Sequence, residues 1–169
     1  TELLDNLDPI PHLSCKDHNR DALQSVLVGW RQRGIASVLA LTGDKPISAK
    51  GVFDLEAINL LQLIRKMNRD VLLKAKPDAL DRVPQFFAGA AVSPFKYTEP
   101  SQMQQYYKME RKIAVGARFL ITQVGWDWRK SLELMAYLRE ADLDVPVIGN
   151  VFFLSTTNPA PRLMRDGKL

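Results

Sequence analysis

Polar residues stand beside apolar, strand-like runs in this sequence, the clearest being His12, Asp44 and Gln123. Each run is followed by a helical pattern, so each residue is expected where a buried parallel strand turns toward its helix. Neighbouring parallel strands bring such residues to one rim of the sheet, which is where ligands bind in proteins of this kind. An imidazole, a carboxylate and a carboxamide on one rim predict an active site.

The candidate with the most informative surroundings is Asp44, which follows Gly43 and precedes Lys45-Pro46. Gly43 would let a ligand approach the backbone, and a carboxylate there can accept hydrogen bonds from ring nitrogens. A Gly-Asp pair before proline is also ordinary turn chemistry, so both interpretations stay open. Gln123 suits the amide-like edge of a heterocycle, but it could equally cap the next loop.

Other residues with reactive or charged side chains are less specific. His12 on its own could be a core histidine. Arg111 and Lys112 could hold a phosphate, or they could be solvated charges favoured by the dipole of the helix on which they are predicted to lie. Cys15 is expected to be a small buried hydrophobe, and Asp127 is expected to cap a helix.

The elements that must position these residues repeat as strand, loop, amphipathic helix and tight return. Apolar runs predict strands at residues 11–15, 35–41, 86–92, 117–124 and 145–154. Helical spacing predicts helices between them, with Gly34 and Gly116 as C-terminal stops. In the helix after residue 127, Leu132, Met135 and Leu138 form the expected apolar stripe. Residues 68–84 are expected to be a long connection with room for one extra helical turn, and residues 162–164 a short helical piece.

The composition is that of an ordinary globular protein, since 46% of its 169 residues are hydrophobic and 25% are charged. The net charge of +4 is not gathered into a basic stripe, so no nucleic-acid partner is expected. No apolar run is long enough to span a membrane, and no metal site is predicted. The single cysteine excludes an internal disulfide and favours a cytoplasmic location. A homo-oligomer remains open.

Strands that are apolar on both faces and separated by helices predict an α/β fold, with a parallel sheet covered by helices. No Gly-rich turn follows the first strand, which disfavours a dinucleotide-binding sheet. The strand–helix units are too few for a complete (β/α)8 barrel of roughly 250 residues. The sequence therefore predicts a TIM-barrel fragment of about five consecutive βα units. Residues 1–169 are expected to be one partial barrel domain, excerpted from a longer chain.

Taken together and in order, residues 11–15, 34–46, 111–117, 121–127 and 145–148 resemble the methylenetetrahydrofolate reductase family, flavin-dependent (β/α)8 barrel enzymes. The resemblance runs from Pro11 to about Leu154 and implies that the chain covers strands three to seven of the barrel. It also implies an oxidoreductase of one-carbon metabolism, with FAD as cofactor. Such an enzyme reduces 5,10-methylenetetrahydrofolate to 5-methyltetrahydrofolate with NAD(P)H as donor.

The resemblance also implies roles for residues that contact the flavin. His12, Thr42, Gly43 and Asp44 would lie along the FAD, with Asp44 near the pyrimidine end of the ring and the bound folate. Arg111 and Lys112 would contact the FAD phosphate and ribose region.

On the folate side, the resemblance implies that Asp44 and Gln123 bind the substrate. Gln123 would contact the pterin or the nicotinamide, which occupy the same face in turn. Asp44 would also act in catalysis, because a carboxylate there could stabilise the cationic iminium form of the folate before hydride attack. The family's catalytic glutamate belongs to the first barrel strand and is absent from this chain.

Some positions depart from the family pattern. Thr42 stands where the family has arginine, Val92 or Ser93 where it has tyrosine, and Gln105 where it has an acid that contacts the flavin. All of these changes fall on the flavin side of the site. An alternative is therefore a flavin-independent, pterin- or methyl-folate-binding methyltransferase, or a non-catalytic relative.

Overall fold

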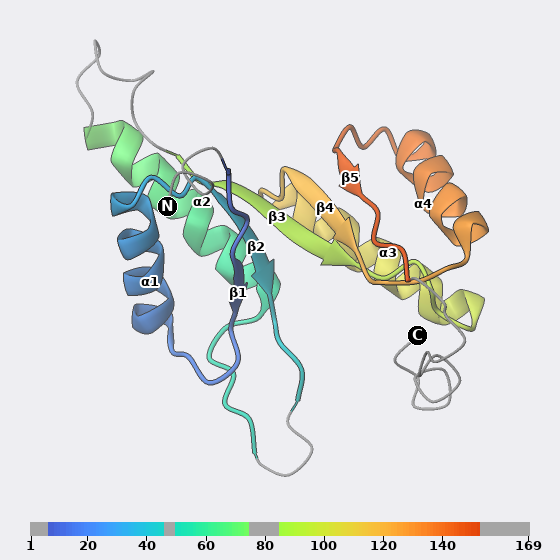
Figure 1. Ribbon diagram of the computed structural model, residues 1–169, viewed down its shortest axis with the longest axis horizontal. Helices are drawn as coiled ribbons and strands as arrows, with labels where there is room; N and C mark the ends of the chain where they lie inside the picture. Colours follow the sequence, from blue (N-terminus) through green and yellow to red (C-terminus); the bar gives the residue numbers. More distant parts are fainter. Residues whose placement is uncertain (1–6, 46–49, 75–84, 153–169) are drawn as a thin grey trace. The chain divides into compact units, whose positions relative to one another are not determined.

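The computed structural model describes residues 7–45, 50–74 and 85–152, in which strands and helices alternate (Figure 1). In chain order the elements are β1 (His12–Ser14), α1 (Arg20–Gln32), β2 (Ser37–Leu41), α2 (Ala57–Lys74), β3 (Phe87–Val92), α3 (Glu99–Ala114), β4 (Phe119–Thr122), α4 (Trp128–Glu140) and β5 (Val147–Ile148). The five-stranded sheet has the order β1-β2-β3-β4-β5, and the pairs β1–β2, β2–β3 and β4–β5 are parallel. The predicted α/β class is confirmed, and this alternation is consistent with a partial TIM barrel.

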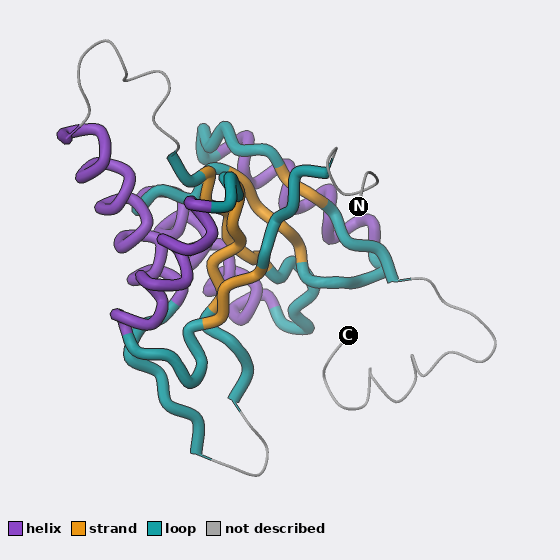
Figure 2. The backbone as a smooth tube through the Cα atoms, turned by 60° about the vertical axis from the view of Figure 1, so that its left-hand side comes forward, coloured by secondary structure: helices purple, strands orange, loops and turns teal. Residues whose placement is uncertain are grey.

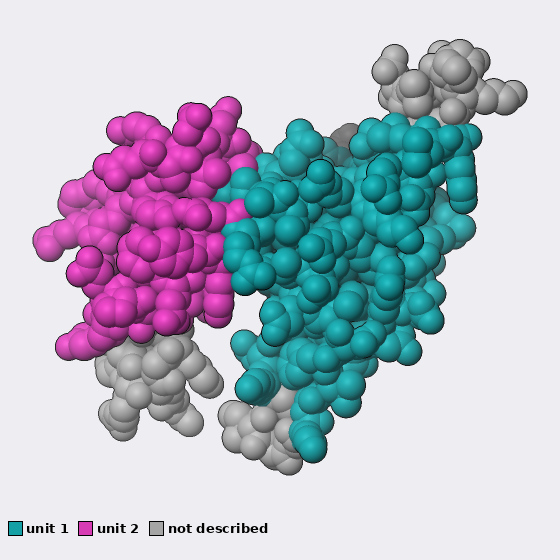
Figure 3. All heavy atoms as spheres, turned by 180° about the vertical axis from the view of Figure 1, so that it is seen from behind, with its two compact units in different colours: residues 1–90, 111–118 teal, residues 91–110, 119–169 magenta. Residues whose placement is uncertain are grey.

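The chain divides into two compact units, coloured separately in Figure 3. Unit 1 comprises residues 1–90 and 111–118, and unit 2 comprises residues 91–110 and 119–169. β3 and α3 each contribute residues to both units. Each unit has its own fully buried side chains, including Leu23, Leu60 and Ile64 in unit 1 and Met109, Leu120 and Leu134 in unit 2.

In unit 1, α1 and α2 lie on one side of β1 and β2 (Figures 1 and 2). The strand register pairs Leu13 with Ala40 and Val38 with Ala88, so these side chains share one face of the sheet. All of them are buried, and Val38 and Ala40 are fully so. This face is therefore the one covered by helices, and the alternating residues of each strand face the other way.

The ends of α1 are fixed by its neighbours in sequence and by one residue far from it. Asn19 caps the helix, because its Oδ1 accepts a hydrogen bond from the Ala22 N–H at 2.8 Å. Asp54, from the β2–α2 loop, accepts another hydrogen bond at this end of α1, from the Arg20 N–H at 2.8 Å. Gly34 ends the helix with φ +77°, as its position in the sequence predicted.

The expectation of a long connection over residues 68–84 is wrong for its first part. α2 continues through Asn68 to Lys74, while residues 75–84 lie outside the described residues. The helix continues because Asn68 has tertiary partners: its Nδ2 donates to the Phe86 carbonyl at 2.9 Å, and its Oδ1 accepts from the Phe86 N–H at 2.8 Å. Arg31 Nη2 also donates to that Oδ1, at 3.0 Å. This side chain thus ties α1 and α2 to the start of β3.

We expect Asn68→Leu to lower the free energy of unfolding by about 2–4 kcal/mol, because it leaves the backbone groups of buried Phe86 without partners. Urea unfolding followed by circular dichroism measures the change. Gln62→Ala, on an exposed position of the same helix, is the matched control and should stay within about 0.5 kcal/mol of the parent protein. Equal effects of the two substitutions would contradict the bridging role of Asn68.

In unit 2, Asp127 caps α4 as predicted, its side chain accepting from the Arg129 N–H at 3.0 Å. The predicted apolar stripe of α4 is only partly right. Leu138 is buried together with Leu134, whereas Leu132 and Met135 are 55% and 45% exposed. β5 is also shorter than expected, and residues 153–154 of the predicted strand and the predicted helical piece at 162–164 lie outside the described residues.

No helix in the described part of the chain combines the length and the apolar character needed to cross a membrane.

Candidate functional site

The loop that presents Asp44 packs tightly against the end of β1. Gly43 has φ +91°, and a Cβ built on it would lie 2.3 Å from Ser14 Oγ and 2.9 Å from Lys16 Cβ. Ser14 Oγ in turn accepts a hydrogen bond from the Lys16 N–H at 3.2 Å. Only glycine fits between these atoms with this backbone conformation. Gly43 is thereby held against the end of β1, and Asp44, itself exposed, comes next after the carboxyl end of β2.

The β1–α1 and β2–α2 loops are joined to each other a short distance further along the chain. Asp17 N–H donates to the Val52 carbonyl at 2.8 Å, and the Val52 N–H donates to Asp17 Oδ1 at 3.1 Å. Lys16 and Phe53 form an antiparallel bridge. Together with the bond from Arg20 to Asp54, these contacts make one hydrogen-bonded surface at the carboxyl ends of β1 and β2. This connection could not be predicted from local sequence patterns, because each partner is more than thirty residues away.

The side chain of Thr42, unlike those of the neighbouring candidate residues, stabilises the start of α2. Its Oγ1 accepts a hydrogen bond from the N–H of Ala57, the first residue of α2, at 3.1 Å. A helix leaves its first N–H groups without internal partners, so the hydroxyl acts as a cap from outside the helix. The side chain at position 42 is therefore engaged with α2, on the face of β2 that the helices cover.

We expect Thr42→Val to lower the free energy of unfolding by about 1 kcal/mol, the usual cost of losing a cap. Valine keeps the shape of threonine but cannot accept the Ala57 N–H. Thr42→Ser, which retains the hydroxyl, should keep most of the stability. Chemical denaturation of the three proteins tests this, and a valine variant as stable as the serine variant would contradict the capping role.

The expected position of His12 at a strand end is wrong. His12 is the first residue of β1 and pairs with Leu39 in the middle of β2, whereas Ser14 ends β1 and pairs with Leu41. The apolar run around His12 starts with Pro11, and the strand begins only after it. His12 is exposed and lies on the same face of β1 as Ser14. Its role beside a flavin stays a prediction.

In unit 2, Gln123 directly follows β4, as predicted, and its side chain is exposed. Its backbone N–H donates to the Val92 carbonyl at 2.7 Å. The preceding Thr122 is buried and bound to Asn150: its Oγ1 accepts the Asn150 N–H at 2.8 Å, and its carbonyl accepts Asn150 Nδ2 at 2.8 Å. Asn150 thus holds the end of β4 from the loop after β5. Because Asp44 belongs to unit 1, convergence of Asp44 and Gln123 on one rim stays a prediction.

A residue of unit 2 that the sequence reasoning missed is Gln102. It is 4% exposed, and its Nε2 donates to the Ser93 carbonyl at 3.1 Å while its Oε1 accepts the Lys96 N–H at 3.0 Å. These bonds fix the loop that leaves β3. The available signal was a carboxamide at helical spacing from Tyr106 and Met109, on what proves to be the buried face of α3.

Arg111 and Lys112 lie in the last turn of α3, within unit 1. Shortly after that turn, the Arg118 N–H donates to the Ala88 carbonyl near the beginning of β3 at 2.7 Å. The pair therefore lies toward the amino ends of the strands, while Asp44 follows the carboxyl end of β2. The structure does not bring Arg111 and Lys112 to Asp44, and their contact with the FAD phosphate stays a prediction.

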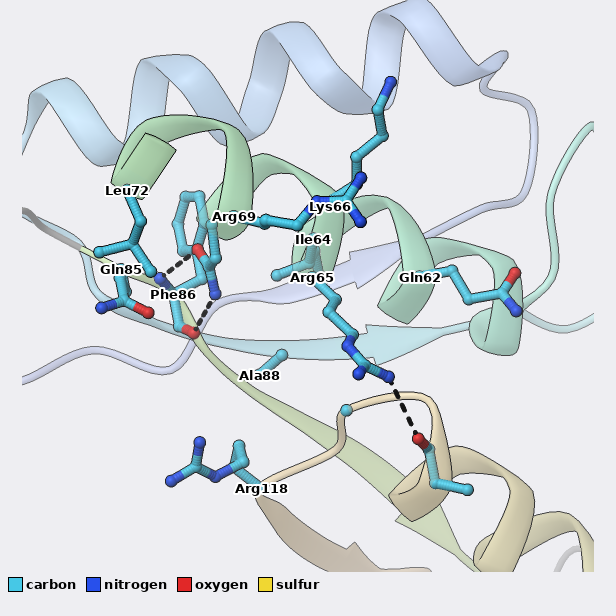
Figure 4. A pocket seen from close by; sticks show the side chains of 13 residues that line it. Gln62, Ile64, Arg65, Lys66, Arg69, Leu72, Gln85, Phe86, Ala88 and Arg118 are labelled. Atoms are coloured by element: carbon cyan, nitrogen blue, oxygen red, sulfur yellow. Dashed lines mark hydrogen bonds between the residues drawn. The ribbon is translucent and has the colours of Figure 1, made fainter. Parts of the chain in front are cut away.

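A cavity of about 710 Å³ in unit 1 opens at this amino-terminal end of the strands (Figure 4). Arg65, Lys66 and Arg69 of α2 line it together with Arg118, and Arg65 Nη1 donates to the Ala114 carbonyl at 3.4 Å. None of the predicted site residues lines it. Size alone therefore does not identify the site, and the loop at Asp44 remains the candidate because of its chemistry.

Among the described residues, neither Cys15 nor a cluster of metal ligands adds to the candidate site. Burial, and secondarily the Glu56 carboxylate, raises the pKa of the Cys15 thiol to about 11. Cys15 is fully buried and protonated at neutral pH, which confirms that it is a small buried hydrophobe. In the part of the chain that the structure describes, no group of three His, Cys, Asp or Glu residues could hold a metal ion.

Comparison with known proteins identifies the family. A family model described as methylenetetrahydrofolate reductase matches residues 3–168. The 5,10-methylenetetrahydrofolate reductases of Salmonella typhimurium and Escherichia coli are each 26% identical to this chain over 157 residues, which is 92% of the chain and 47% of each relative. The chain thus spans about half the length of the curated relatives it matches. Its strand order, the fixed Gly43-Asp44 loop and the match over almost every residue agree: this chain belongs to the methylenetetrahydrofolate reductase family.

Proposed function

We propose that the protein reduces 5,10-methylenetetrahydrofolate to 5-methyltetrahydrofolate with FAD as cofactor and NAD(P)H as donor. The family match supports an oxidoreductase that acts on this folate. The observation that carries the proposal is the geometry at Asp44. An exposed carboxylate follows the carboxyl end of a parallel strand, on a loop whose position is fixed by the contact of Gly43 with Ser14 and Lys16. A carboxylate carried by a closely packed backbone at this edge suits electrostatic catalysis, because the backbone that presents it needs little rearrangement during the reaction.

When bound, FAD supplies the hydride chemistry that amino-acid side chains cannot perform. Asp44 would place its negative charge beside the folate, where the iminium form of the substrate carries a positive charge. This attraction raises the share of the reactive cation and orients it for reduction. Gln123 would donate to and accept from the edge of the pterin, and thereby fix its orientation.

The described residues fit the flavin ring of FAD better than they fit its phosphates. Gly43 and Asp44 offer backbone and carboxylate groups at an exposed rim, which suits the polar edge of the flavin ring. Thr42 cannot replace the phosphate contact of the family's arginine, since it carries no charge and its hydroxyl caps α2. Binding of the FAD phosphates by Arg111 and Lys112 is accordingly part of the proposal.

The alternative of a flavin-independent methyltransferase is not favoured, because the curated relatives are named as reductases. We further propose that the protein acts in the cytoplasm, where its free, buried Cys15 stays reduced.

The spectrum of the intact protein tests the flavin directly. We expect the purified protein, or the protein after addition of FAD and gel filtration, to show the absorbance of bound flavin. It should also oxidise NAD(P)H when 5,10-methylenetetrahydrofolate is supplied. A protein that binds folate but retains no flavin under these conditions would contradict the proposed function.

A further inference from the structure

Phe95 is an aromatic residue of unit 2 whose ring rests on the backbone of a glycine. A Cβ built on Gly125 would overlap the Cδ2, Cε2 and Cζ atoms of the Phe95 ring. Phe95 belongs to the loop after β3, and Gly125 belongs to the loop after β4. Phe95 is only half-buried there, so part of its ring stays open to a ligand.

The loop that carries Phe95 is held on both sides of this residue. The buried Gln102 side chain donates from its Nε2 to the Ser93 carbonyl at 3.1 Å and accepts the Lys96 N–H at its Oε1 at 3.0 Å. Pro94, directly before Phe95, is fully buried. An ordered loop therefore presents the ring, which lowers the entropy that a ligand must remove when it binds.

The backbone beneath the ring is held as well. Gly125 pairs with Val151 in a parallel bridge, and its carbonyl accepts the Phe152 N–H at 2.8 Å. Gly125 is buried, and its lack of a side chain leaves the space that the Phe95 ring occupies. Two ordered loops thus meet at the ring.

This arrangement brings the ring close to Gln123. β3 and β4 are neighbours in the sheet, and the Gln123 N–H donates to the Val92 carbonyl at 2.7 Å. Gly125 follows Gln123 by two residues, so their Cα atoms are at most about 7 Å apart. One bicyclic heterocycle can therefore reach both the carboxamide of Gln123 and the ring of Phe95.

The two side chains recognise different parts of such a heterocycle. A carboxamide donates to and accepts from its polar edge, whereas an aromatic ring stacks on its flat face. We propose that Phe95 is the stacking surface for the pterin of the folate whose edge Gln123 contacts, and that it makes this site selective for a pterin. The proposal rests on the proposed function, in which Gln123 binds the folate.

A ring that only filled the space above Gly125 would behave differently. Leucine can also fill space of this kind, but it offers no aromatic face for stacking. Tyr97 lies on the same loop and is fully exposed, so it shows what an aromatic residue without a seat contributes. The two roles of Phe95 can therefore be separated by substitution.

Calorimetric titration of the intact protein with 5-methyltetrahydrofolate, the proposed product, tests the stacking role. We expect Phe95→Leu to raise the Kd about fivefold, the scale of one aromatic contact. Phe95→Tyr keeps the aromatic face and should retain most of the affinity. Tyr97→Leu is the matched control and should leave the Kd unchanged. The stoichiometry is fitted separately, so any unfolded protein lowers the number of sites and not the affinity.

Gly125→Ala displaces the ring without altering it. The new methyl group would overlap the Phe95 ring, while the φ of Gly125 lies outside the left-handed region, so the backbone itself is not strained. We expect a loss of affinity similar to that of Phe95→Leu. Gly149→Ala, where a Cβ would meet nothing within 4 Å, is the matched control and should bind as the parent protein does.

Two results would overturn the stacking role. Equal affinities of the parent protein and Phe95→Leu would make the ring a filler of space. A loss confined to the binding of FAD, titrated in the same variants, would assign the ring to the cofactor instead.

Failure of the proposed function would look different. A protein that retains no flavin, yet binds 5-methyltetrahydrofolate with the expected dependence on Phe95, would contradict the reductase and keep the stacking role. A flavin-containing reductase in which Phe95→Leu binds the folate as the parent does would keep the function and remove only the stacking role. A parent protein that does not bind the folate would contradict both.

Discussion

Replacing Asp44 by asparagine is expected to slow the reduction of 5,10-methylenetetrahydrofolate by at least about tenfold, the scale expected when one charge-stabilising group is removed from beside a developing cation. Asparagine keeps the size of the side chain and its ability to accept a hydrogen bond, but it removes the negative charge. Because Asp44 is exposed and its loop is held by backbone packing at Gly43, the substitution should leave the fold intact. The loss should therefore appear in catalysis and not in stability.

The two half-reactions separate this role from others. Reduction of the flavin by NAD(P)H involves no cationic folate, so Asp44→Asn should affect it less than the folate step. Stopped-flow absorbance of the intact protein follows each step on its own. Asp8→Asn, at an exposed carboxylate upstream of β1, is the matched control and should change neither rate. Equal losses in both half-reactions would assign Asp44 a structural role instead.

Gly43→Ala is expected to cause the largest loss of the substitutions considered, in both stability and ligand binding. A side chain at φ +91° is strained, at a cost of about 1–3 kcal/mol. The new methyl group would also overlap Ser14 Oγ and Lys16 Cβ, which lie 2.3 and 2.9 Å from its ideal position. The loop must then move away from β1 and carry Asp44 with it. Urea unfolding measures the stability, and flavin and folate titrations measure the displacement of the site.

Gly34→Ala isolates the effect of backbone strain. Gly34 has φ +77°, but a Cβ there would meet nothing within 4 Å. We expect this control to cost only about 1 kcal/mol and to leave ligand binding unchanged. Adding Ser14→Ala to Gly43→Ala removes the closest overlapping atom and should restore part of the lost stability. If Gly34→Ala and Gly43→Ala lowered the free energy of unfolding and ligand binding equally, the close packing at Gly43 would not contribute to either.

Much of the architecture was predictable because it depends on local patterns. Buried strands, amphipathic helices and their stops at Gly34 and Gly116 follow from apolar spacing and from the freedom of glycine to adopt positive φ. The same patterns placed Asp44 shortly after β2, Gln123 directly after β4, and Asp127 at the start of α4. The family could also be identified from the sequence, since the order of several short motifs carries more information than any one of them.

Tertiary structure alone decided how these elements meet. His12 starts its strand instead of ending it, because pairing with β2 sets the register of β1. The N–H of Ala57 donates a hydrogen bond to the hydroxyl of Thr42, and the Phe86 carbonyl accepts one from Asn68. Backbone groups that the fold buries need such partners, and only the tertiary structure determines which side chains are close enough. Leu132 belongs to an apolar row that points away from the core of unit 2. The residue type shows that a side chain is apolar, and its spacing along the chain shows on which side of a helix it lies. Only the neighbouring elements determine whether that side is covered.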